Sequence, residues 1–128
     1  MSCDQSQCKP MERFENRTVL VTGADGGLGR ACVTRLLREG ASVVLADLTF
    51  SWDQHTKDLR DARNTLFYSC DVTDSSSVND LAASALERFG AIGALVTFAG
   101  TARFADTLDV TGRDWAFQFD VDVRGTLL

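Results

Sequence analysis

Four glycines fall within seven positions near the start of the chain, in the stretch TGADGGLG at residues 22–29. An apolar β-branched run precedes this stretch and an amphipathic run follows it, which predicts a buried strand that turns directly into a helix. The first N–H groups of a helix lack intrahelical partners and carry partial positive charge, so such a turn can bind a phosphate or pyrophosphate. Glycine lets the ligand approach the backbone. A turn without a ligand would need one glycine, so a phosphate lying against residues 23–29 is the stronger interpretation.

Asp47 is the second residue whose position suggests chemistry. It ends the next predicted strand, downstream of the glycine turn. In a dinucleotide-binding fold a carboxylate at this place accepts hydrogen bonds from the adenosine ribose, and it would repel a 2′-phosphate. Neither Asp25 nor Gly26 offers a positive charge, and we expect no basic residue near Asp47. The sequence therefore favours NAD over NADP; the plainer alternative is a surface aspartate at a strand end.

The elements that must position these residues alternate along the chain. We expect strands at 18–22, 42–46, 65–70 and 92–98, and helices at 27–39, 52–62 and 75–89. The first helix would bury Leu28, Cys32 and Leu36 on one face. Strands that alternate with helices predict parallel pairing and right-handed crossovers. Residues 111–128 are ambiguous, because apolar and polar residues alternate in WAFQFDVDVRG and slightly favour a strand by pattern alone.

Composition excludes several classes of function. The chain has 128 residues and a net charge of −5 with no cluster of Lys or Arg, so we expect one domain and no nucleic-acid partner. There is no bilayer-length apolar run and no signal peptide, which predicts a cytoplasmic protein without a membrane partner. No Lys-Ser or Lys-Thr follows the glycines, which excludes a P-loop. The four cysteines (Cys3, Cys8, Cys32 and Cys70) and the single histidine lack metal-ligand spacing, so we expect no metal site.

The spacing T-G-x-x-x-G-x-G at residues 22–29 resembles the short-chain dehydrogenase/reductase family. Other segments resemble that family in the right order: Asp71-Val72, LVTFAG at 95–100, Trp115, and VDVRG at 121–125. The resemblance covers the chain from about Phe14 to its last residue. It implies an α/β fold, a three-layer doubly wound Rossmann-type parallel sheet with about four strands in the order 3-2-1-4. It also makes 111–128 a helix, which we adopt because the chain must cross over to a next strand.

The resemblance also assigns cofactor-binding positions. It places the glycine turn around the pyrophosphate and its ribose, the strand-end aspartates at the adenosine, and the segment after the fourth strand at the inner ribose. The predicted cofactor-binding residues are Gly23, Asp25, Gly26, Gly27, Leu28, Gly29, Asp47, Asp71, Val72, Ala99 and Gly100.

The chain departs from the family pattern at residues that bear on catalysis. Thr97-Phe98 stands where the family has two asparagines, and Asp122 stands where it has an asparagine of the catalytic set. The family's catalytic serine and Tyr-x-x-x-Lys would lie beyond Leu128, so we assign no catalytic residue with confidence. We expect a disordered leader at 1–13 and an NAD(P)-binding Rossmann domain at 14–128, truncated before the catalytic segment.

The function that follows is an NAD(P)-dependent oxidoreductase that moves hydride between nicotinamide and a carbonyl or alcohol substrate. The family implies a homo-oligomer, a dimer or tetramer. The strand at 92–98 would have an open edge, and the last helix would expose Trp115, Phe117 and Phe119, so we expect the isolated chain to be marginally stable. The alternatives are a non-catalytic dinucleotide-binding module or pseudoenzyme and, third, an S-adenosylmethionine-dependent methyltransferase.

Overall fold

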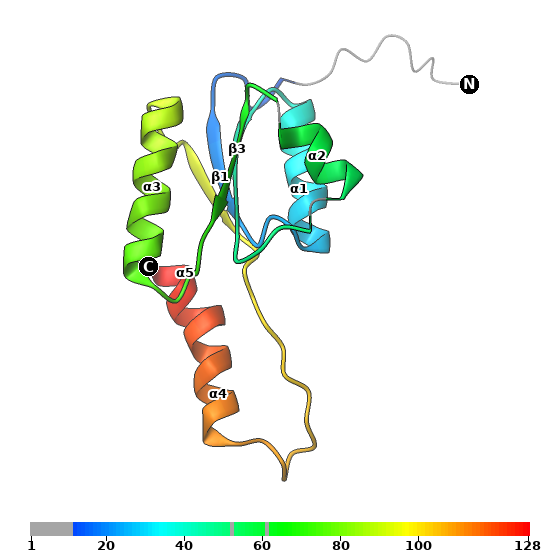
Figure 1. Cartoon of the computed structure of the whole chain (residues 1–128), viewed down its shortest axis with the longest axis vertical. Coiled ribbons are helices and arrows are strands. Elements are labelled where there is room, and N and C mark those ends of the chain that lie inside the picture. Colours follow the sequence, from blue (N-terminus) through cyan, green and yellow to red (C-terminus); the bar gives the residue numbers. More distant parts are fainter. Residues whose placement is uncertain (1–11, 52, 61) are drawn as a thin grey trace, which may run out of the picture.

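A computed structural model describes residues 12–128 with the exception of Trp52 and Asp61. The leader predicted at residues 1–13 therefore lies outside the described residues apart from Glu12 and Arg13, as do Cys3 and Cys8. The described chain forms a three-layer body, a sheet between helices, and an arm that extends away from it (Figure 1).

The sheet has four parallel strands: β1 (Thr18–Thr22), β2 (Ser42–Asp47), β3 (Thr65–Ser69) and β4 (Ala94–Thr97). Their order is β3-β2-β1-β4, which confirms the predicted topology. Because β1 lies at the centre, all five of its residues are buried. The fourth strand is shorter than the predicted 92–98.

Helices cover both faces of the sheet. Figure 1 shows α1 (Gly27–Arg38) and α2 (Gln54–Arg60) on one face and α3 (Ser75–Phe89) on the other. The predicted bounds of α3 are confirmed, since the Asp74 side chain accepts a hydrogen bond from the Ser76 N–H and Gly90 ends the helix with a φ of 80°. The helix predicted at 52–62 is observed as α2. It begins at Gln54, so Asp53 lies outside it, and it ends at Arg60.

Each face of the sheet carries its own apolar core. Val19, Val21, Val43 and Leu45 point to the α1 side, where they meet Val33 and Leu36 of α1. The intervening residues Leu20, Val44 and Ala46 pack with Cys70, Leu81 and Ala85 on the α3 side. This alternation is the period-two pattern of a strand buried on both faces.

Leu28 corrects the predicted helix face. It was expected beside Cys32 and Leu36, but its side chain is 74 % exposed, and Gly29 and Val33 are buried instead. The inward face of α1 is therefore rotated by about one residue, because Gly29 must lie against the turn that precedes the helix.

Residues 101–128 form the segment that we call the C-terminal arm. After an irregular stretch it folds into α4 (Gly112–Phe119), a π-helical turn η1 (Asp120–Arg124) and the short α5 (Gly125–Leu127). The slight preference for a strand was therefore wrong, and the helix implied by the family resemblance is confirmed. Thr111 and Asp114 form a reciprocal capping box that starts the helix.

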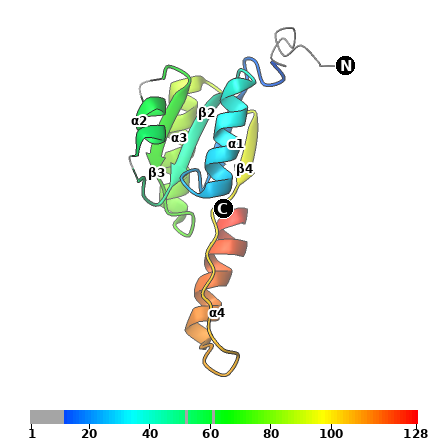
Figure 2. The same ribbon diagram turned by 90° about the vertical axis from the view of Figure 1, so that its right-hand side faces the viewer.

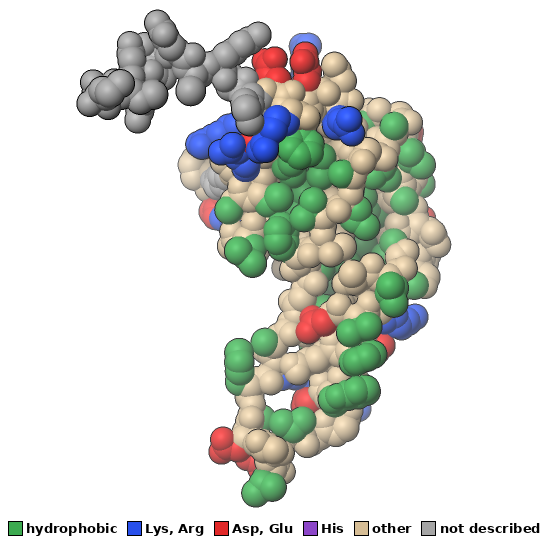
Figure 3. All heavy atoms as spheres, turned by 180° about the vertical axis from the view of Figure 1, so that it is seen from behind, with side chains coloured by type: hydrophobic (Ala, Val, Ile, Leu, Met, Phe, Trp, Pro, Cys, Tyr) green, Lys and Arg blue, Asp and Glu red, His purple; other side chains and the backbone are tan. Residues whose placement is uncertain are grey.

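The arm leaves the body beyond the carboxyl ends of the strands, and its last turn comes back to that end of the body, near the start of α3 (Figures 1 and 2). Large apolar side chains remain exposed along it, including Trp115 at 60 %, Phe117 and Phe119, and Leu95 on the open edge strand is also exposed. Figure 3 shows hydrophobic side chains gathered on the body and along the arm. These exposures confirm the predicted open edge and helix face. None of the helices in the described chain is long and apolar enough to cross a membrane.

Glu39 ties the start of the described chain to the end of α1. Its carboxylate is nearly buried and accepts hydrogen bonds from Arg13 Nε and Nη2, both at 2.6 Å, and from Arg35. The hydrogen bonds from Arg13 and then Arg35 lower the pKa of Glu39 to about 2. The Phe14 N–H also donates to the Glu39 carbonyl, so this corner holds the strand entry against the helix.

We expect the stability of the fold to depend on pH through Glu39. The folded-state pKa lies below the value of about 4.3 for an unfolded glutamate, so the stabilisation is present above that pH and is lost as the pH falls toward 2. Glu39→Gln should lower the melting temperature near neutral pH and flatten its fall in acid. Thermal unfolding from about pH 7 to 3 measures this. The matched control is Glu87→Gln on α3; equal acid sensitivity of both variants and the parent would contradict the prediction.

Candidate functional site

The turn between β1 and α1 is held by close contacts between main-chain atoms. Gly23 has a φ of +65°, and a Cβ added there would come within 2.5 Å of the Ala99 amide nitrogen that follows β4. A Cβ on Gly29 would come within 2.1 Å of the Gly23 carbonyl oxygen. Both positions therefore require glycine for the fold itself, because any side chain would separate α1 or β4 from the turn.

Gly27 differs from these two glycines. A Cβ added there meets no atom within 4 Å, and the residue begins α1. Its backbone is helical, so the fold does not need glycine at this position. The first N–H groups of a helix have no intrahelical partner, so the amides that begin α1 are available to an anion. Gly27 is thus the glycine of the turn that packing leaves unexplained.

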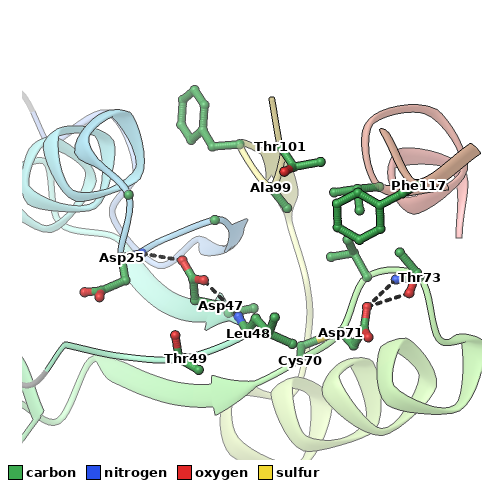
Figure 4. A pocket seen from close by; sticks show the side chains of 17 residues that line it. Asp25, Asp47, Leu48, Thr49, Cys70, Asp71, Thr73, Ala99, Thr101 and Phe117 are labelled. Carbon is green, nitrogen blue, oxygen red and sulfur yellow. Dashed lines mark hydrogen bonds between the residues drawn. The ribbon is translucent and has the colours of Figure 1, made fainter. Parts of the chain in front are cut away.

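A cavity of about 530 Å³ lies at the carboxyl ends of the strands (Figure 4). This is the size of a small-molecule site, and its position agrees with the rule that ligands of open α/β sheets bind where the strand order reverses. The end of β2 and the segments that follow the other three strands form its walls, and the arm closes one side. The lining residues are Gly23, Asp25, Gly26, Ala46, Asp47, Leu48, Thr49, Cys70, Asp71, Val72, Thr73, Phe98, Ala99, Gly100, Thr101, Phe117 and Val121.

Asp47 is fixed in this cavity by main-chain donors. Its Oδ2 accepts from the Asp25 N–H and its Oδ1 from the Leu48 N–H, both at 2.8 Å (Figure 4). The first of these bonds ties the end of β2 to the glycine turn. Each carboxylate oxygen has further acceptor capacity, so the side chain can still receive hydroxyl donors from a ligand.

Asp25 carries a basic neighbour that the sequence did not predict. Arg30, one turn into α1, donates from Nε to the Asp25 carbonyl and from Nη2 to its Oδ1, both at 2.8 Å. Arg30 therefore brings a positive charge to Asp25, whereas its hydrogen bonds in the described chain do not reach Asp47, so the absence of a basic residue beside Asp47 stays a prediction. Burial opposes the charge on Asp25, but hydrogen bonds from Ser51 and Arg30 outweigh it and lower its pKa.

The loop after β3 forms the opposite wall. The Asp71 Oδ1 accepts from the Thr73 N–H at 2.9 Å and from the Thr73 hydroxyl at 2.7 Å, and these bonds lower the pKa of Asp71. Cys70 lies beneath this loop, and burial raises the pKa of its thiol. Figure 4 shows Phe117 reaching from the arm toward Thr73 and Asp71.

Most of the predicted cofactor residues meet in this one cavity. Gly27, Leu28 and Gly29 are the exceptions, because they lie in the first turn of α1 behind Gly26. Asp122 is not part of the cavity lining. Its Oδ1 accepts from the Thr101 N–H at 2.8 Å and so fastens the helical part of the arm to the residue at which the arm begins.

Several cavity residues were missed from the sequence. Leu48, Thr49, Cys70 and Thr73 lie within two residues of Asp47 or Asp71, so including the two residues on either side of each predicted aspartate would have found them. Phe117 and Val121 carried no such signal, because they come from the arm and reach the cavity only through its path in space. The further residues not predicted are Ala46, Phe98 and Thr101.

Comparisons with known proteins agree with this architecture. The sequence profile described as short chain dehydrogenase matches residues 17–128. The chain is 36 % identical over 120 residues to fluoren-9-ol dehydrogenase of Terrabacter, covering 87 % of the chain and 34 % of that protein. It is 33 % identical over 116 residues to sorbitol dehydrogenase of Cereibacter sphaeroides, covering 90 % and 44 %. A solved short-chain dehydrogenase/reductase of Brucella melitensis, a glucose/ribitol dehydrogenase, superposes with a TM-score of 0.82 at 31 % identity, covering 89 % and 48 %.

The chain belongs to the short-chain dehydrogenase/reductase family. It spans between about a third and a half of the length of these relatives, and the part it matches is their N-terminal portion. Family members typically use NAD(P). This membership leaves the methyltransferase alternative without support.

Alanine substitutions should separate the two roles of glycine in the turn. We expect Gly29→Ala to lower the free energy of unfolding by at least about 3 kcal/mol, because the new Cβ collides with main-chain atoms that cannot yield. Gly27→Ala should change it by less than about 1 kcal/mol, since the position is open and alanine favours helix. Urea unfolding followed by circular dichroism gives both values, and equal losses would contradict the assigned packing.

Proposed function

We propose that the chain forms the dinucleotide-binding portion of an NAD-dependent dehydrogenase or reductase. The supporting observation is the cavity that joins the glycine turn, Asp47 and Asp71 at the carboxyl edge of the sheet. The residues suit a dinucleotide at both ends. The open space at Gly27 accepts a diphosphate beside helix N–H groups, and the two aspartates offer acceptors to an adenosine.

Within this proposal each wall has a defined task. The N–H groups of residues 27–29 and the Gly23–Gly26 turn hold the pyrophosphate. Asp47 accepts from the adenosine ribose, Asp71 and Val72 border the adenine, and Ala99 and Gly100 border the inner ribose. Bound NAD supplies the hydride acceptor; the chain's residues position it and keep its reactive end beside β4.

NAD is preferred to NADP because of the charge at the ribose end. The Asp47 carboxylate is held in place by two main-chain N–H groups, so it cannot swing away from an added phosphate. A 2′-phosphate would meet that charge at short range, which is unfavourable by Coulomb repulsion.

The reaction proposed for the whole protein is hydride transfer between nicotinamide and the carbon of a carbonyl or alcohol, with a small-molecule substrate. A non-catalytic dinucleotide-binding module is the second candidate. Phe98 supports it, since this side chain lines the cavity where the family pattern has a polar asparagine. Asp122 supports it too, because its carboxylate is engaged with the Thr101 N–H and cannot donate a hydrogen bond when ionised.

We also assign the exposed face of the arm to contact with a second copy of the chain. Trp115 and Phe119 stack at 4.7 Å between ring centroids, and both remain about half exposed. An apolar helix face of this kind is typical of a subunit interface. Sedimentation should show a dimer or tetramer that Trp115→Ser together with Phe119→Ser converts to monomer; a parent chain that is already monomeric would contradict this assignment.

Direct binding tests the proposed function. Isothermal titration of the chain with NADH, NADPH and S-adenosylmethionine should show binding of NADH, weaker binding of NADPH and none of S-adenosylmethionine. Gly27→Ala should weaken NADH binding by about tenfold or more, because its methyl group occupies the space proposed for the diphosphate.

The control is Gly112→Ala, at the start of α4, where an added Cβ also meets no atom within 4 Å. This variant should bind NADH as the parent does. Failure of the folded parent to bind NADH, or full NADH affinity in folded Gly27→Ala, would overturn the proposal. Activity of the whole protein on a carbonyl or alcohol substrate would then distinguish the enzyme from the non-catalytic module.

A further inference from the structure

Arg30 is a cation at the rim of the cavity whose guanidinium is fully engaged by its own chain. Besides the two bonds from Nε and Nη2 to Asp25, Nη2 donates to the Ser51 hydroxyl and Nη1 forms an ion pair with Asp53. The Arg30 side chain is only 26 % exposed. All three of its nitrogens therefore have acceptors from the turn after β1 or the loop after β2.

The cluster formed by Arg30 with Asp25, Ser51 and Asp53 includes a residue of the proposed cofactor site. Asp25 lines the cavity, and its N–H is bonded to Asp47, the residue proposed to hold the adenosine ribose. Arg30 is therefore linked to Asp47 through Asp25, which is bonded to both residues. A guanidinium there would otherwise be suited to a 2′-phosphate, since its planar fork binds phosphate oxygens in pairs.

We propose that Asp53 masks Arg30 and so acts as a second determinant of cofactor specificity, from outside the cavity. The inference rests on the proposed dinucleotide site. Two carboxylates surround one guanidinium, so the cluster presents net negative charge to the ribose end and reinforces Asp47. Withdrawing Asp53 would release Nη1 and leave one guanidinium against one carboxylate, so the cluster would lose its net negative charge.

Asp53 is well suited to this role because its other contacts are local. Its Oδ1 accepts from the Thr56 N–H at 3.1 Å, at the start of α2. The hydrogen bond from Arg30 and then that from Thr56 lower the pKa of Asp53 to about 2, so it remains charged at neutral pH. An amide or hydroxyl at this position can still cap the helix, whereas it cannot neutralise Arg30.

The experiment measures the affinities of the full chain for NAD⁺ and NADP⁺ by isothermal titration at low and high salt. Asp53→Asn should raise NADP⁺ affinity relative to NAD⁺ on the order of threefold to tenfold, the scale expected for one partly exposed charge. The gain should shrink as salt rises. Arg30→Gln in the Asp53→Asn background should abolish it.

Asp58→Asn is the matched control, because it removes the same charge from α2 at a residue that accepts from Gln54 and not from Arg30. It should leave the ratio unchanged. If Asp53→Asn unfolds the chain, Asp53→Ser keeps a capping oxygen and serves instead. A parent that binds NAD⁺ with no shift in the folded Asp53 variant, or the same shift in Asp58→Asn, overturns this inference alone. A parent that binds neither nucleotide overturns the proposed function and this inference with it.

Discussion

The architecture depends on direct contact between main-chain atoms at the turn after β1. Gly29 packs against the Gly23 carbonyl, and Gly23 packs under the backbone that follows β4. These two contacts bring the N-terminus of α1 to the carboxyl edge of the sheet and place the segment after β4 beside it. The cavity exists because four strand ends converge there, and its anion-binding character follows from the helix start that the glycines hold in place.

Much of this could be read from the sequence, for physical reasons. Strands buried on both faces and helices with one apolar face give strong periodic signals, so the order of elements was predicted from the pattern, whereas the strand order 3-2-1-4 came from the family resemblance. Asp47 was found from its position at a strand end, whereas Asp25 and Asp71 were assigned by the family resemblance. The C-terminal arm was misjudged by pattern, since alternation in WAFQFDVDVRG carried no information about the Thr111 capping box that begins α4.

Contacts between side chains that are far apart in the sequence could not be predicted from the pattern of residues along the chain. Arg30 looked like an ordinary helix residue, and only the fold brings it to Ser51 and Asp53. Phe117 and Val121 likewise enter the cavity through the path of the arm. Leu28 was assigned to the core because the helix register was fixed from apolar spacing alone, whereas the packing of Gly29 on the turn sets the true register.

The central claim is that the backbone at the start of α1 binds the diphosphate of a dinucleotide. Backbone amide chemical shifts, measured by nuclear magnetic resonance as NAD⁺ is added, test it most directly. The account predicts that the largest changes fall on the amides of Gly27, Leu28 and Gly29, with further changes at Asp47 and Asp71. Saturable binding that leaves those three amides unperturbed and shifts only residues of the C-terminal arm would contradict it.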